Sequence, residues 1–122
     1  GSDRLVVDLE GAVTGYTASY VSRVEQLGSG AVVPLAGAAD LEILVEAAAY
    51  DDAGRATYRP RTRSRAVNVS GYSTFRQVAF TGSFEGQTLI GLGVRARLPM
   101  RVFVLDGPGD GSRLVIDVAH RW

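Results

Sequence analysis

Alternating apolar and polar residues mark two stretches of nearly the same sequence, one near each end of the chain. Residues 4–9 are Arg-Leu-Val-Val-Asp-Leu, and residues 113–118 are Arg-Leu-Val-Ile-Asp-Val. Successive side chains of an extended strand point to opposite faces of a sheet. The pattern therefore predicts two equivalent strands that place matching apolar rows against one core, with their Arg and Asp on the opposite face. The two predicted rows are Leu5, Val7 and Leu9, and Leu114, Ile116 and Val118.

Other short runs of β-forming residues end at turn residues and predict further strands. They cover residues 16–24, 32–35, 74–81, 88–94 and 100–105.

The clearest alternation in the middle of the chain runs over residues 41–49, where Glu42 and Glu46 lie opposite a row of aliphatic side chains. This alternation predicts another strand with one buried face. Because Ala, Leu and Glu favour helices, a helix over residues 38–49 is the alternative. The predicted buried row is Leu41, Ile43, Val45, Ala47 and Ala49.

About seven to nine short strands, with turn signals roughly every ten residues, predict an all-β fold, either a sandwich or a barrel. At 122 residues the chain has the size of one domain, which we place over residues 1–122. Gly91 and Gly93 fall on the same face of one predicted strand. This spacing indicates either a bulge or the close approach of another stretch of backbone on that side.

Composition narrows the classes of function. Thirteen basic residues, all arginine, and thirteen acidic residues cancel, so no overall field attracts nucleic acid or an anionic membrane. No apolar run approaches the roughly 20 residues that a membrane-spanning helix needs. The chain has no cysteine, which excludes disulfides and thiolate metal sites. Gly1 and Ser2 are expected to be either the start of a mature exported fragment or a remnant of cloning.

No catalytic motif is present in the sequence. His120 is the single histidine, and no Gly-x-Ser-x-Gly segment accompanies it. One histidine without cysteine does not suffice for a zinc site. Asp106 and Asp110 flank glycines but lack the ligand spacing of a calcium loop, so we expect a tight turn there. We therefore expect a protein that is not an enzyme and that has neither a metal nor a cofactor.

Residues 55–66 form an arginine-rich segment without apolar periodicity. One interpretation is an exposed loop or a ragged edge strand whose arginines pair with nearby carboxylates. The other is a patch that binds an anionic partner. The residues that this second interpretation selects are Tyr58, Arg59, Arg61 and Arg63.

Four segments of the chain resemble the AMIN-like domain found in exported proteins and lipoproteins of actinobacteria, mycobacteria included. They are residues 3–7, 84–93, 99–105 and 113–120. The resemblance extends over essentially the whole chain. The AMIN-like domain is itself distantly similar to the AMIN domain that accompanies cell-wall amidases and secretins. It implies a β-sandwich of two packed sheets with approximate internal symmetry. It also implies a non-catalytic, extracytoplasmic role, secreted or lipid-anchored at the cell envelope, with peptidoglycan or another wall glycan as the expected ligand.

Arginine forks suit the carboxylates of peptidoglycan peptides. The matched polar pairs of the repeated motif are therefore candidate ligand-binding residues, and Arg101 has similar standing. The alternative is that each Arg forms a surface ion pair with the Asp of its own strand, worth about 0–1 kcal/mol. A second hypothesis for the whole domain is that it binds an envelope protein through sheet edges or the arginine-rich segment. The motif pairs are Arg4 with Asp8 and Arg113 with Asp117.

Overall fold

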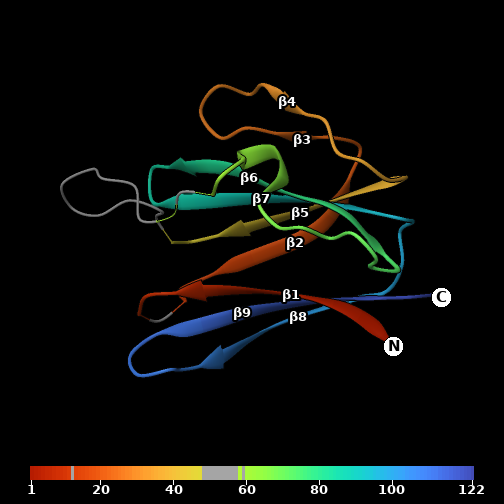
Figure 1. Ribbon diagram of the computed structural model, residues 1–122. Helices are drawn as coiled ribbons and strands as arrows, with labels where there is room; N and C mark the ends of the chain where they lie inside the picture. The colour runs from red at the N-terminus through yellow and green to blue at the C-terminus, as the bar shows by residue number, and fades with distance from the viewer. Residues whose placement is uncertain (12, 48–57, 59) are drawn as a thin grey trace.

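The structure is a computed structural model that describes residues 1–11, 13–47, 58 and 60–122 (Figure 1). The described residues form two antiparallel sheets that pack face to face, which confirms the predicted all-β sandwich. The three-stranded sheet has the order β1-β9-β8. Its strands are β1 (Ser2–Leu9), β8 (Met100–Asp106) and β9 (Ser112–Ala119).

The four-stranded sheet has the order β2-β5-β7-β6, and a two-stranded ribbon, β3-β4, lies against its outer side (Figure 1). One short 3-10 helix, η1 (Arg63–Arg65), precedes β6. The described residues contain no helix that is long and apolar enough to cross a bilayer. The strands are β2 (Tyr16–Val21), β3 (Val24–Glu25), β4 (Val32–Val33), β5 (Ala39–Val45), β6 (Phe75–Phe84) and β7 (Gln87–Val94).

The core lies between the two sheets and is built from the rows that the alternation predicts. Leu114, Ile116 and Val118 of β9 are fully buried, and Leu5 of β1 is nearly so. Val7 and Leu9 are partly buried and pack against the same core. Each buried aliphatic side chain contributes roughly 1.5–3 kcal/mol of transfer free energy. These rows therefore determine which face of each strand points inward.

The middle of the chain is a strand, so the helix alternative over residues 38–49 is wrong. In β5 the buried residues alternate with half-buried ones, as one strand face against a core requires. Ala47 is partly buried, whereas Ala48 and Ala49 lie outside the described residues. Helix propensity differs by only a few tenths of a kcal/mol per residue, which burial of a whole apolar row outweighs. The buried residues of β5 are Ala39, Leu41, Ile43 and Val45.

The two copies of the repeated motif are neighbours in one sheet. β1 and β9 pair antiparallel, with Leu5 opposite Ile116 and Val7 opposite Leu114. Because the pairing reverses one copy relative to the other, the Arg of each copy stands opposite the Asp of the other copy. The repeat in sequence thus becomes a local two-fold arrangement in the sheet.

Hydrogen bonds join the two sheets along both sides of the sandwich. On the β2–β8 side, the hydroxyl of Tyr20 donates to the carbonyl of Leu98 at 2.5 Å, and that of Tyr16 donates to the carbonyl of Val102 at 3.4 Å. On the β1–β6 side, the buried Asp3 carboxylate accepts from the backbone N–H groups that begin β6. These contacts fix how one sheet lies over the other.

The two glycines of β7 lie where the segment that contains Leu35 and Ala36 approaches closely, which is one of the two alternatives that their spacing predicted. A Cβ built on Gly93 would overlap the carbonyl oxygen of Ala36, and one on Gly91 would lie 3.2 Å from Leu35. Gln77 of β6 holds the same segment, because its Oε1 accepts from the N–H of Ala36 at 2.8 Å. The glycines therefore allow the chain that follows β4 to rest on the four-stranded sheet.

Candidate functional site

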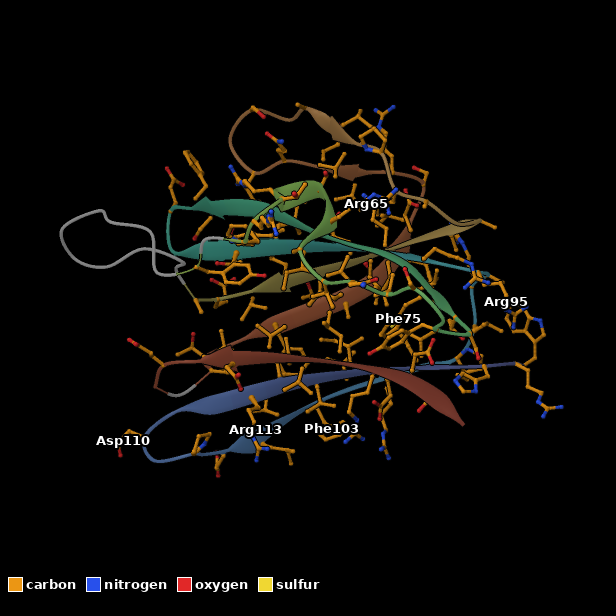
Figure 2. All side chains as sticks on the ribbon, in the orientation of Figure 1. Arg65, Phe75, Arg95, Phe103, Asp110 and Arg113 are labelled. Atoms are coloured by element: carbon orange, nitrogen blue, oxygen red, sulfur yellow. The ribbon has the colours of Figure 1, made fainter. Side chains whose placement is uncertain are left out.

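The outer face of the three-stranded sheet carries a row of charged side chains that crosses all three strands. Strand register places Arg4 opposite Asp117 on one side of β9 and Arg101 opposite Asp117 on the other. We call Arg4, Asp117 and Arg101 the arginine row. Figure 2 shows Phe103 and Arg113 on the same outer face, on the side away from the four-stranded sheet.

Asp117 is the buried centre of the arginine row. Its side chain is 8% exposed, and Arg4 donates two hydrogen bonds to it, Nε to Oδ1 at 2.7 Å and Nη2 to Oδ2 at 2.9 Å. Arg101 adds a longer bond from Nη2 to Oδ2 at 3.3 Å. The hydrogen bonds from Arg4 lower the pKa of Asp117 below its ordinary value, although burial acts in the opposite direction. Asp117 is therefore held as a carboxylate.

The two arginines of the row remain open to solvent. Their side chains are 51% exposed in Arg4 and 71% exposed in Arg101. Two guanidinium groups share one carboxylate, so the row keeps one positive charge in excess. Since a guanidinium has five N–H donors, each arginine has donors left that can reach a ligand.

An aromatic ring lies beside the arginine row. The guanidinium carbon of Arg101 is 4.9 Å from the centre of the Phe103 ring, and that of Arg4 is 5.7 Å away. Both distances fall within the range of cation–π attraction. Two exposed apolar side chains share this face: Leu105, two residues further along β8, is 37% exposed, and Val6 of β1 is 44% exposed. The face thus combines cationic donors with a small apolar surface.

The alternative that each Arg pairs with the Asp of its own strand is wrong for the described residues. Arg4 pairs with Asp117 of the other copy because directly opposite side chains of paired strands lie only about 5 Å apart, whereas positions i and i+4 of one strand are about 13 Å apart. The symmetric pair behaves differently. Asp8 is exposed, and the buried Nε of Arg113 has no hydrogen-bond partner among the described residues.

The candidates from the arginine-rich segment lie away from this face. The rings of Tyr58 and Phe80 meet edge to face at 4.9 Å, and the guanidinium of Arg63 stands 5.2 Å from the same Phe80 ring of β6. Arg61 is exposed, and Arg59 lies outside the described residues. The described part of the segment contains η1 and no strand. The site candidates therefore fall into two groups on different sheets.

Asp3 and His120 form a polar cluster that the sequence interpretation missed. Asp3 Oδ1 lies 2.8 Å from His120 Nε2, while Oδ2 accepts from the N–H groups of Thr74 at 2.6 Å and Phe75 at 3.0 Å. Burial pushes the pKa of Asp3 upward, but these hydrogen bonds outweigh it and leave the pKa below its ordinary value. One signal was present in the sequence: Asp3 has the same parity as the inward row of β1, which begins at Leu5.

Phe103 was also missed, although it shares the parity of Arg101 in β8. Alternation alone was enough to place both side chains on one face. The described residues contain no cluster of three or more His, Asp and Glu side chains that could hold a metal ion. What the outer face can do chemically is bind carboxylates or other anions next to an apolar group.

Comparison with known proteins identifies the family. The family model of the AMIN-like domain matches residues 1–120. The chain belongs to the AMIN-like domain family. No curated protein and no solved structure gives a significant match. Membership supports a cell-wall-associated, extracytoplasmic binding module of a family whose domains are generally non-catalytic.

Proposed function

We propose that this AMIN-like domain is a non-catalytic module that binds peptidoglycan through the outer face of its three-stranded sheet. The arginine row with Phe103 carries the proposal, because it joins solvent-exposed guanidinium donors to an aromatic ring on an ordered sheet. Family membership supports an extracytoplasmic setting. Within that setting we place the domain at the cell envelope, either secreted or lipid-anchored. The ligand itself is our inference from the chemistry of this face.

The chemical match is between arginine forks and the carboxylates of peptidoglycan peptides. Arg101 has one weak contact to Asp117 and is the more exposed arginine, so it is the best placed to bind a ligand carboxylate in a paired fashion. Arg4 is held by Asp117 and presents its remaining N–H groups at a fixed position. The apolar side chains around Phe103 offer a surface for the less polar faces of N-acetyl sugars.

The test is co-sedimentation of the domain with purified peptidoglycan. We expect the wild type to sediment with the polymer at low salt and to be released progressively as salt screens the guanidinium–carboxylate attraction. Arg101→Gln should weaken binding about fivefold, and Arg4→Gln combined with Arg101→Gln should weaken it at least about tenfold. Thermal unfolding of each variant verifies that it is folded.

The matched control is Arg23→Gln. Arg23 is also an exposed arginine paired with a carboxylate, Glu25, at 3.8 Å, but it lies next to β3, beyond the four-stranded sheet. This variant should bind as the wild type does. A wild type that stays in the supernatant at low salt would refute the peptidoglycan proposal, and equal binding by the Arg101 variant would refute the proposed site.

A protein partner is the second candidate function. The observation that favours it is the apolar surface of Val6, Phe103 and Leu105, which a protein interface would bury more fully than a sugar. If this is the function, Leu105→Ser should abolish capture of the partner protein. Neither the wild type nor any variant should then bind peptidoglycan. Retention of the wild type on peptidoglycan, with loss on Arg101→Gln, would decide against it.

A further inference from the structure

A hollow of about 430 Å³ lies beside β6, away from the arginine row. Its volume is within the range of roughly 300–1,000 Å³ that small-molecule sites occupy. One wall is the segment that follows η1, and the other is the start of β6. Figure 2 shows Arg65, the last residue of η1, and Phe75 at the start of β6. The lining residues are Arg65, Val67, Asn68, Val69, Ser70, Gly71, Tyr72, Phe75 and Arg76.

Contacts at both ends attach this segment to β6. At one end, Val67 forms a β-bridge with Val78, and the N–H of Ala66 donates to the Val78 carbonyl at 2.8 Å. At the other end, the Tyr72 and Phe75 rings stack at 5.7 Å with an angle of 11° between their planes. The hollow is the space between these two attachments.

Local hydrogen bonds fix the conformation of residues 68–76, which form most of the lining. Arg76 Nη1 donates to the carbonyls of Tyr72 at 3.2 Å and Ser73 at 3.0 Å. The side chain of Asn68 accepts from the N–H of Ser70 at 3.0 Å, and the N–H of Tyr72 donates to the carbonyl of Val69 at 3.1 Å. A wall that is ordered before a ligand arrives reduces the entropy that binding costs.

The lining of the hollow is cationic and partly apolar. It contains two arginines, Arg65 and Arg76, and no carboxylate, although the chain as a whole has equal numbers of acidic and basic residues. Its apolar part is also accessible, since Tyr72 is 43% and Val67 is 38% exposed. In the part of the chain that the structure describes, Arg76 Nε and Nη2 donate no hydrogen bond to protein.

We propose that this hollow binds a small amphipathic anion, a carboxylate or a phosphate attached to an apolar body such as a ring. The anionic group is bound between Arg65 and the Nε–Nη2 edge of Arg76, where charge-assisted hydrogen bonds are strongest. The apolar body lies against Tyr72 and Val67, which lose exposed surface on binding. The site is independent of the peptidoglycan face, so either can exist without the other.

The test is an NMR titration of the ¹⁵N-labelled domain with three probes that each carry a phenyl ring. The probes are 4-phenylbutyrate, phenyl phosphate and the neutral 4-phenylbutanol. At least one anion should produce saturable shifts in the amide signals of residues 67–76, with the alcohol at least about fivefold weaker. The two anionic probes distinguish a carboxylate site from a phosphate site. Equal affinity for the alcohol and both anions would overturn the proposal.

Variants test which side chains do the binding. Arg65→Gln should weaken binding of the anion about fivefold, while Arg61→Gln, four residues earlier and outside the lining, should leave it unchanged. Tyr72→Ala should weaken both the anions and the alcohol, and Tyr72→Phe should retain binding because it keeps the ring and its stacking on Phe75. Equal effects of Arg65→Gln and Arg61→Gln, or shifts centred on the three-stranded sheet, would refute this site.

Discussion

Arg4 and Asp117 lie 113 positions apart in the chain, yet they are direct cross-strand neighbours joined by hydrogen bonds of 2.7 and 2.9 Å. The register that creates this pair also places Asp8 opposite Arg113. Only the first pair has a second arginine, Arg101, on the next strand and a buried carboxylate at its centre. A symmetric sequence repeat has thus produced two pairs with unequal roles.

The unequal roles predict unequal effects of removing each carboxylate's charge. Asp117→Asn replaces the charged partner of two arginines with a neutral group of the same shape, and should lower the free energy of unfolding by about 1–3 kcal/mol. Asp8→Asn, at an exposed position, should change it by less than about 0.5 kcal/mol. Urea unfolding at neutral pH measures both. Equal losses, or a larger loss in Asp8→Asn, would mean that the buried pair is not the stabilising one.

The lowered pKa values predict how stability responds to acid. Asp3 and Asp117 both have pKa values below those of an unfolded chain. The stability that these two carboxylates contribute is therefore fully present above the pKa of Asp in the unfolded chain, which is about 4. As the pH falls through the lower folded values, the unfolded state binds protons first and stability is lost. Urea unfolding between neutral pH and about pH 2.5 should show this fall, and a variant with Asp3→Asn and Asp117→Asn should show less of it.

Asp40 provides a control of opposite sign. Burial raises its pKa, so its folded state binds a proton more readily than its unfolded state and gains stability on acidification. The variant Asp40→Asn should therefore lose stability more steeply with falling pH than the wild type does. A shallower loss of stability with falling pH in this variant would contradict the raised pKa of Asp40.

Much of the fold follows from period-two alternation, because burying an apolar row is the largest favourable contribution to folding. The strands that carry Leu5 and Ile116 bury their apolar rows only when those faces point to the core, and this is the orientation in the structure. The helix alternative over residues 38–49 rested on propensity, which is the weaker effect. Similarly, the spacing of Gly91 and Gly93 predicted either a bulge or a close approach, without revealing that residues 35–37 would make that approach.

The candidate site was less accessible to prediction because its contacts depend on which strands become neighbours. Alternation places Arg4 and Asp117 on outer faces, but only the pairing of β1 with β9 brings them together. The same limit hid the bond between Asp3 and His120, which joins the two ends of the chain. Strand parity can be inferred from a single sequence, whereas long-range partners cannot.

The close approach at β7 predicts a sharp difference between its two glycines. Gly93→Ala places a Cβ against the carbonyl oxygen of Ala36, so the backbone of that segment must move, at a cost of about 1–3 kcal/mol. Gly91→Ala meets the end of the flexible Leu35 side chain at 3.2 Å, which can shift, and should cost clearly less. Thermal and urea unfolding of the two variants provide the measurement. A larger loss for Gly91→Ala would show that the segment does not rest on the sheet as described.

The tyrosines of β2 predict which inter-sheet bond matters more for stability. Tyr20→Phe removes the hydroxyl that donates at 2.5 Å to the carbonyl of the buried Leu98, and should lower the free energy of unfolding by about 0.5–1.5 kcal/mol. Tyr16→Phe removes an exposed bond of 3.4 Å and should cost less than about 0.5 kcal/mol. Burial also raises the pKa of Tyr20. Urea unfolding decides, and a cost for Tyr16→Phe equal to that for Tyr20→Phe would show that burial of the acceptor does not determine the strength of these bonds.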